Sequence, residues 1–164
     1  MTYAIIFNSL TGNTKILADH IAKSLPKEDC LYFGKPDLEA LKADIIYLGF
    51  WTIKGQCDVP TEKFLSNLEN KKVFLFGTCG YGQDVQYFNQ IISNTKALLP
   101  DSTKVIGSFM CQGKMGPQVR KRYEDLLGDP KQHDKMLHLI ENFDQALSHP
   151  NQNDLDELSA KIKF

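Results

Sequence analysis

The chain has 164 residues, of which 42% are hydrophobic and 24% are charged, a length and composition typical of one globular domain. Nineteen basic and twenty acidic residues leave a formal charge of −1, which excludes a general electrostatic attraction to nucleic acid or to an anionic membrane surface. No apolar run approaches the roughly 20 residues that span a bilayer, and the first residues lead into a strand without a basic signal region, so we expect a cytoplasmic protein.

Five short runs rich in apolar, β-branched or aromatic residues predict strands, at 3–7, 30–33, 45–50, 73–76 and 105–110. Stretches with the 3.6-residue period of an amphipathic helix lie between and after them, at 13–25, 60–68, 85–99, 119–126 and 136–147. Strands that alternate with helices form right-handed βαβ units around a parallel sheet. We therefore expect an α/β fold, doubly wound in three layers, with a helix after each of five strands.

The chain ends in a polar segment, residues 149–153, and a last amphipathic stretch with apolar side chains at Leu155, Leu158 and Ile162. The polar segment predicts a hinge. Three arrangements of the last helix stay open at this point: it docks on the domain, exchanges with a partner or frays.

Ligands of doubly wound sheets bind beyond the carboxyl ends of the strands, so the loops after the first, third, fourth and fifth strands are candidates. In the first loop, the hydroxyls of Ser9, Thr11 and Thr14 surround Gly12 at the start of a helix. Hydroxyls and N-terminal helix amides suit an anion, and a loop without lysine or arginine suits the phosphate of a mononucleotide. The Walker A and G-x-G-x-x-G patterns are absent. Alternatively, the threonines only cap the helix, and the loop alone does not decide.

Two further loops contain an aromatic residue among polar or small ones. Trp51, the only tryptophan, lies at the carboxyl end of the third strand, where its ring is well placed to stack on a flat ligand. Tyr81 follows the fourth strand, between glycines at 77, 80 and 82. The alternative for Tyr81 is an ordinary glycine turn with a surface tyrosine. Three ligand-type loops at one sheet edge together indicate a binding site.

These residues resemble the flavodoxin family. Residues 9–14, SLTGNT, match the flavodoxin phosphate loop [ST]-x-T-G-x-T after the first strand, and residues 76–84, followed by Tyr87 and Phe88, are similar to the loop that covers one flavin face. Trp51 stands where flavodoxins have an aromatic residue on the other face. The resemblance covers about residues 1–147. It implies a flavodoxin-like three-layer sandwich, a five-stranded parallel sheet in the order 2-1-3-4-5, and one non-covalent FMN.

The same resemblance implies the residues of the site. The first loop would hold the phosphate, Trp51 and Tyr81 would sandwich the isoalloxazine ring, and nearby backbone would meet its polar edge. The set is Ser9, Leu10, Thr11, Gly12, Asn13, Thr14, Phe50, Trp51, Thr52, Thr78, Cys79, Gly80, Tyr81 and Gly82. Residues 1–148 would form the FMN-binding domain, and residues 149–164 a polar hinge with a short C-terminal amphipathic helix. Residues 49–52, 76–78 and 107–115 are also similar to the BilS subfamily, which is associated with bilirubin reduction in gut anaerobes.

Three features depart from the pattern of a general flavodoxin carrier. The chain is near neutral, whereas such carriers are usually strongly acidic, so docking through a large negative face is not expected. Lys54 stands in the tryptophan loop, where a cation close to the flavin would raise its potential unless solvent screens it. Lys114 and residues 120–122 form a basic cluster after the fifth strand, which would suit an acidic partner or an anionic substrate, or is only a solvated face.

Three functions fit the sequence. The favoured one is an electron carrier between a donor reductase and an acceptor enzyme; the alternatives are an FMN-dependent NAD(P)H oxidoreductase that acts directly on a small acceptor, and a flavin-free docking module. The four cysteines, Cys30, Cys57, Cys79 and Cys111, contain no C-x-x-C pair and no zinc spacing, so no metal is expected. Since no histidine lies in a loop at the ligand edge, Cys79 is not expected to be a catalytic nucleophile.

Overall fold

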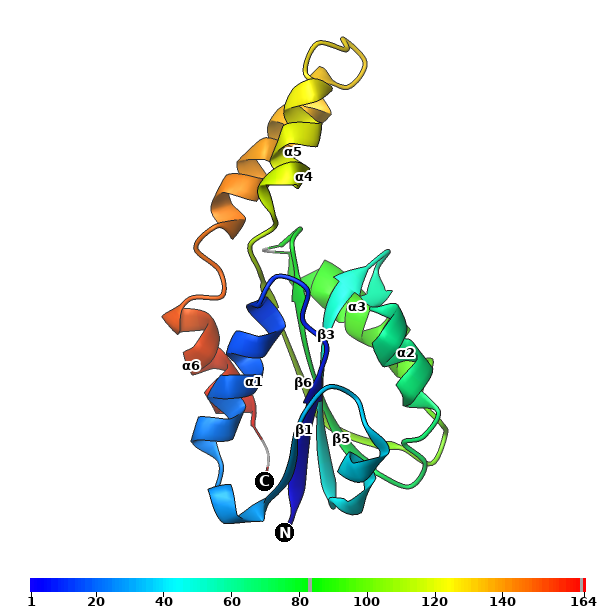
Figure 1. Ribbon diagram of the computed structural model, residues 1–164. Helices are drawn as coiled ribbons and strands as arrows, with labels where there is room; N and C mark the ends of the chain where they lie inside the picture. The colour runs from blue at the N-terminus through cyan, green and yellow to red at the C-terminus, as the bar shows by residue number, and fades with distance from the viewer. Residues whose placement is uncertain (83, 163) are drawn as a thin grey trace.

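A computed structural model, which describes residues 1–82, 84–162 and 164, contains a twisted sheet between two layers of helices (Figure 1). The parallel strands are β1 (Tyr3–Phe7), β2 (Cys30–Gly34), β3 (Ile45–Ile53), β5 (Lys72–Cys79) and β6 (Lys104–Gln112). Their order is β2-β1-β3-β5-β6, and the two-residue β4 (Gln56–Cys57) pairs antiparallel with the end of β3. With β4 set aside, this is the expected order 2-1-3-4-5, so the predicted flavodoxin-like fold is confirmed.

Each face of the sheet is covered by two helices. Alternate residues of β1 point to opposite faces: Ala4 and Ile6 join the core under α2 (Val59–Leu65) and α3 (Val85–Lys96), whereas Tyr3, Ile5 and Phe7 join the core under α1 (Asn13–Ser24) and α6 (Gln152–Lys161). Since both faces are covered, the strands are nearly continuous in apolar residues.

The expectation of a helix after every strand is wrong for β2. Only ten residues separate Gly34 from Ile45, and they form the 3-10 turn η2 (Leu38–Lys42). Another 3-10 turn, η1 (Lys27–Asp29), precedes β2. A crossover helix with a connecting loop at each end needs about a dozen residues or more. The short η2 therefore connects β2 to β3 instead.

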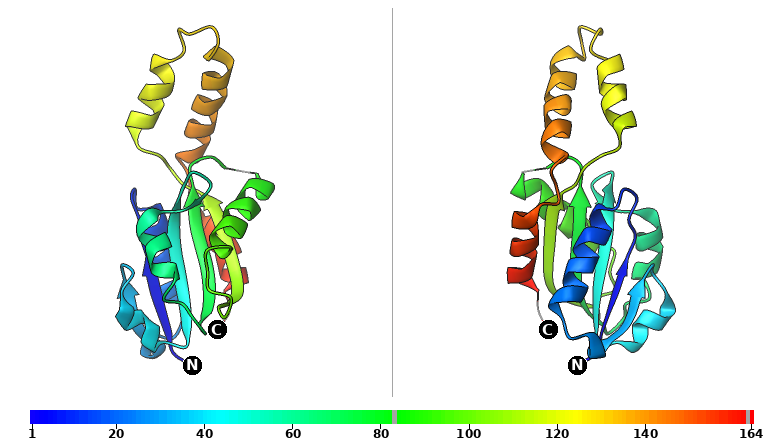
Figure 2. Two further views of the ribbon diagram at one scale, coloured as in Figure 1. Left: turned by 90° about the vertical axis from the view of Figure 1, so that its right-hand side faces the viewer. Right: turned by 60° about the vertical axis from the view of Figure 1, so that its left-hand side comes forward.

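Two helices stand clear of the sheet. The antiparallel pair α4 (Pro117–Asp125) and α5 (His133–Ala146) projects beyond the carboxyl ends of the strands, as Figures 1 and 2 show. We call residues 117–146 the arm. An ion pair from Arg120 of α4 to Asp144 of α5 joins its helices, and Arg120 also pairs with Glu124 on its own helix. Among the described residues α4 has no buried side chain. The arm therefore lies outside the two cores of the sheet.

The C-terminal helix docks on the domain. Leu158 of α6 is fully buried with Leu17 and Ile21 of α1, and α6 lies beside α1 and β6 (Figure 1). Of the three arrangements left open by the sequence, docking is the one observed. The helix α6 thus completes one layer on the sheet, and the segment that stands apart is the arm. In the part of the chain that is described, no helix has both the length and the apolar character needed to cross a bilayer.

Replacing Asn151 with alanine is expected to lower the free energy of unfolding by about 1 kcal/mol, because this residue caps α6. Its side chain accepts a hydrogen bond from Asp154 N at 3.0 Å, and Asp154 Oδ2 accepts one from Asn151 N at 2.8 Å. Urea unfolding followed by circular dichroism measures the loss. The control is Gln152→Ala at the exposed neighbouring position, with a change within about 0.5 kcal/mol; equal changes in both variants would contradict a capping role.

Candidate functional site

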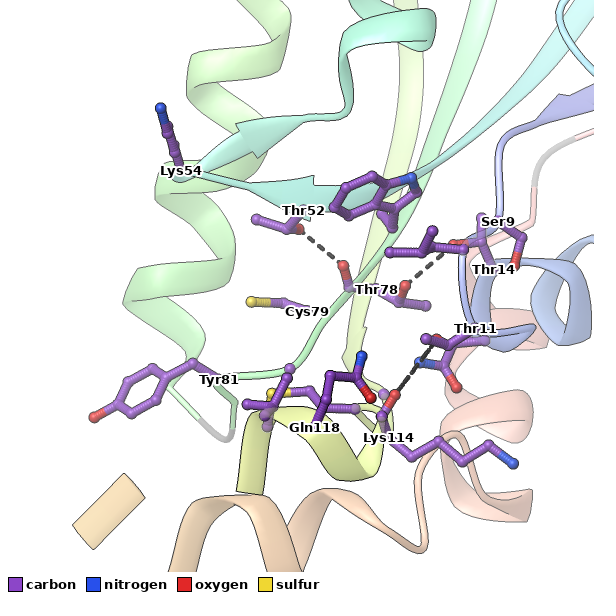
Figure 3. A pocket seen from close by; sticks show the side chains of 18 of the residues that line it. Ser9, Thr11, Thr14, Thr52, Lys54, Thr78, Cys79, Tyr81, Lys114 and Gln118 are labelled. Atoms are coloured by element: carbon purple, nitrogen blue, oxygen red, sulfur yellow. Dashed lines mark hydrogen bonds between the residues drawn. The ribbon is translucent and has the colours of Figure 1, made fainter. Parts of the chain in front are cut away.

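A cavity of about 320 Å³ lies at the carboxyl ends of β1, β3, β5 and β6. Four segments form its walls, residues 9–14, 51–54, 78–81 and 113–119, with Tyr87 of α3 behind them. Figure 3 shows side chains from these segments around one space. Three of the segments were expected from the sequence, and the structure brings them together at one edge of the sheet.

The first wall is the loop that leads into α1. Gly12, the N-cap residue, has φ 91°, a conformation that favours glycine, and it has no side chain to accept from the first N–H groups of the helix. The first turn also contains no acidic residue. Apart from Lys15 N, which donates to Ser9 Oγ, the N–H groups in the first turn of α1 and the positive end of its dipole are therefore available to an anion in the cavity.

The hydroxyls of this loop have different partners. Thr14 is buried, and its Oγ1 lies 3.2 Å from Phe50 O and 3.1 Å from Thr78 Oγ1, so it links α1 to β3 and β5. Ser9 Oγ accepts a hydrogen bond from Lys15 N at 3.3 Å, which leaves its own proton free for a ligand. Asn13 Nδ2 donates to Thr11 Oγ1 at 2.9 Å, and this bond fixes the hydroxyl at the cavity wall.

The second wall is strand rather than the expected loop. β3 continues past Phe50 because Trp51 pairs with Thr78 of β5 and Thr52 pairs with Cys57 of β4. The chain then reverses at Lys54 and Gly55, whose φ values of 50° and 78° are those of a tight hairpin turn. Trp51 is thus held by strand pairing with β5, and the residue after it by pairing with β4, a more rigid support than a loop.

A buried carboxylate positions this wall. Asp58 is 0% exposed and accepts hydrogen bonds from Trp51 N at 3.3 Å, Asn8 Nδ2 at 2.9 Å, and both the N and Oγ1 of Thr61, at 3.0 and 2.9 Å. Asn8 directly precedes the first loop. One side chain therefore links the tryptophan strand, the loop before α1 and the start of α2.

The third wall contains a thiol that suits packing rather than catalysis. Cys79 is 6% exposed, and burial raises the pKa of its thiol above the ordinary value, although contacts with Tyr81 backbone, Thr52 and Tyr87 oppose that shift. A raised pKa keeps the sulfur protonated at neutral pH. Thr52 Oγ1 donates to Thr78 O at 2.8 Å and fixes the adjoining strand ends.

Tyr81 lines the cavity but does not point across it. Its hydroxyl lies 3.3 Å from His138 Nε2 of the arm, and its ring meets the edge of Tyr87 with centroids 5.9 Å apart. Figure 3 shows Tyr81 directed away from Thr78 and Cys79. A ring sandwich with Trp51 would require Tyr81 to turn inward and break its contact with His138.

Three of the expected site residues do not line the cavity. Phe50 is fully buried in the core, and only its carbonyl, bonded to Thr14, lies near the site. Gly82 lies on the outer side beside His138 and Asn142 of the arm. Gly12 contributes the backbone turn that leads into α1, and it does not line the cavity itself. Gln83, part of the segment compared with the flavin-covering loop, is outside the described residues.

The fourth wall is the candidate loop after the fifth predicted strand, but none of its residues was in the expected set of FMN-binding residues. It follows β6 and consists of Gly113, Lys114, Met115, Gly116, Gln118 and Val119. A Cβ on Gly113 would lie 2.4 Å from Asn13 Nδ2, and one on Gly80 would lie 2.5 Å from Met115 Sδ. The glycines allow the walls to approach closely, and this pair of glycines at neighbouring strand ends is the sequence signal that could have identified the wall.

Two buried polar atoms of the cavity walls have no hydrogen-bond partner among the described residues: Trp51 Nε1, a donor, and Asn13 Oδ1, an acceptor. An unpaired buried polar atom costs free energy. A bound molecule with an anionic end and a flat ring system would place the anion at the N-terminus of α1, beside the Ser9 hydroxyl, and the ring system against the Trp51 side chain. The residues present therefore fit a flavin mononucleotide.

Comparison with known proteins agrees with this geometry. A sequence model described as "Flavodoxin domain" matches residues 4–163. The chain is 37% identical over 172 residues to the flavodoxin-like domain-containing protein BilS of Clostridium symbiosum, covering 94% of this chain and 90% of that protein. It is 31% identical to BilS of Clostridioides difficile, covering 99% and 95%. A flavoprotein of Lactobacillus acidophilus solved in complex with FMN has a TM-score of 0.52 and 18% identity, covering 67% of this chain and 93% of that one.

Proposed function

Because the chain belongs to the flavodoxin family, we propose that it is an electron-transfer protein that takes electrons from a donor reductase and passes them to an acceptor enzyme. Its cofactor is FMN, which supplies the redox chemistry when bound. The observation that supports this most strongly is a cavity at the carboxyl edge of the sheet that brings the N-terminus of α1, with glycine as its N-cap residue, together with the side chain of Trp51.

The proposed roles follow from the position of each wall. The N-terminus of α1, with the Ser9 hydroxyl, holds the phosphate, and Thr11 and Asn13 fix the shape of the loop through their bonds to each other and to Lys114 O. Trp51 covers one face of the isoalloxazine ring, and the backbone of residues 78–80 meets its polar edge. Tyr81 stands at the rim, where its hydroxyl contacts His138. These side chains bind and orient the flavin and exclude water from one side of it.

A carrier fits better than an enzyme that acts alone. The only thiol at the site, Cys79, is buried and protonated because of its raised pKa, and in the described part of the chain no histidine lines the cavity to act as an acid or base. The similarity to BilS supports an acceptor enzyme of bilirubin reduction. We place the protein in the cytoplasm, where its free cysteines stay reduced.

Anaerobic photoreduction of the purified protein with FMN, followed by absorbance, tests this proposal. We expect a shifted flavin spectrum on binding and reduction in two separate one-electron steps. Reduction by NAD(P)H alone, without a partner, would replace the carrier by the NAD(P)H oxidoreductase. Failure to bind FMN would overturn both and leave the flavin-free docking module.

A further inference from the structure

We propose that Lys114 supplies the positive charge that the phosphate loop lacks, and that it thereby makes the site select FMN over riboflavin. The proposal rests on FMN as the ligand of the cavity. The first loop, residues 9–14, contains no basic residue, and Lys114 is more than a hundred positions away in the chain. The fold brings the two together.

Hydrogen bonds fix the backbone of Lys114 beside the first loop. Its carbonyl accepts from Asn13 Nδ2 at 2.8 Å and from Thr11 Oγ1 at 3.4 Å. Its N–H donates to His149 O at 3.0 Å. Gly113, where a Cβ would meet the Asn13 side chain, allows this approach. The base of the Lys114 side chain is therefore held next to the residues that face the phosphate.

The Lys114 side chain itself is free to reach a ligand. It lines the cavity and is exposed, and within residues 1–82, 84–162 and 164 no carboxylate pairs with it. Figure 3 places its base at the same end of the cavity as Thr11, away from Lys54, with the ammonium group directed outward, so the flexible side chain would turn toward the bound phosphate. The nearby cations differ: Lys15 pairs with Asp19 at 2.7 Å, and Arg120 pairs with Asp144 and Glu124.

The charge of the ligand gives this lysine its effect. A phosphate monoester carries close to two negative charges at neutral pH, whereas a helix N-terminus offers only about half a positive charge. A flexible lysine side chain with an unpaired ammonium group balances part of the remainder. Riboflavin has the same ring system without the phosphate, so it gains nothing from Lys114.

Binding of FMN and of riboflavin to Lys114→Gln, measured by quenching of flavin fluorescence, tests the proposal. At low salt we expect FMN affinity to fall about tenfold and riboflavin affinity to change less than about twofold, since one charge interaction is lost for FMN alone. The FMN difference should shrink at about 0.5 M salt, because ions screen an exposed charge. Lys114→Arg should retain the wild-type preference for FMN.

The matched control is Lys121→Gln, which removes the same charge from an exposed position of α4 that does not line the cavity. An equal effect of both substitutions, equal loss of FMN and riboflavin, or unchanged FMN affinity in Lys114→Gln would each overturn the role of Lys114. Those outcomes leave FMN binding by the wild-type protein intact. Absence of FMN binding to the wild-type protein would instead overturn the proposed function and this inference together.

Discussion

Asp58→Ala is expected to lower the free energy of unfolding by about 3 kcal/mol, because hydrogen bonds to a buried charged group are strong and their loss leaves donors unpaired. Asp58 accepts from four donors on three separate segments, at Trp51, Asn8 and Thr61. An alanine methyl group replaces none of these bonds. FMN affinity should also fall, because Trp51 and the loop after Asn8 lose their common support.

Urea unfolding of the protein without FMN and fluorescence titration with FMN measure the two effects separately. Asp58→Asn keeps one oxygen acceptor for Thr61 and should lie between wild type and alanine. The control is Asp37→Ala, since Asp37 is exposed and, among the described residues, accepts only from Glu39 N, at 2.9 Å at the start of η2. Its expected cost is that of an ordinary cap, about 1 kcal/mol. Equal losses at positions 37 and 58 would show that the links to Trp51 and Asn8 contribute nothing.

Trp51→Ala is expected to weaken FMN binding by about 1–3 kcal/mol, the scale of burying a large aromatic side chain. This corresponds to an affinity roughly 5- to 150-fold lower. The strand pairing of position 51 with Thr78 uses only backbone atoms, so the sheet should form in the variant. Quenching of flavin fluorescence measures the dissociation constant.

Trp51→Phe separates the two contributions of the indole. Phenylalanine keeps an aromatic face but has no N–H to replace the unpaired Nε1. If stacking dominates, the phenylalanine variant should bind FMN nearly as well as wild type. If the N–H contributes most, phenylalanine and alanine should be similarly weak. An unchanged affinity in Trp51→Ala would mean that Trp51 does not contact the flavin.

The layers of the fold could be predicted because they depend on local patterns. Continuous apolar strands such as Tyr3–Phe7 require cover on both faces, and helical stretches between them supply it. The residues at which the strands end were harder to predict. Trp51 and Thr78 look like loop residues in sequence, but each becomes strand through pairing with the other, a contact that no local window contains.

Helical periodicity identifies an apolar face but does not identify its partner. The stretches that became α5 and α6 are both amphipathic, yet Leu158 of α6 is buried on the sheet whereas Leu147, just after α5, is 54% exposed. The basic cluster expected at Lys114 and residues 120–122 does not act as one patch either. Arg120 is paired with Asp144 and Glu124, whereas Lys114 lines the cavity. These outcomes depend on contacts between residues far apart in the chain.

The two ends of the arm meet at its base. Lys114, just before the arm, donates its N–H to the carbonyl of His149, just after it, at 3.0 Å, and Asn142 bonds to Gly80 and Gln112 on the body of the domain. The arm is thus a long insertion whose two flanking segments are hydrogen-bonded to each other. Changes in the length or sequence of such a loop cost little elsewhere. Insertion, shortening or exchange between relatives can therefore reshape the tip of the arm without rebuilding the sheet.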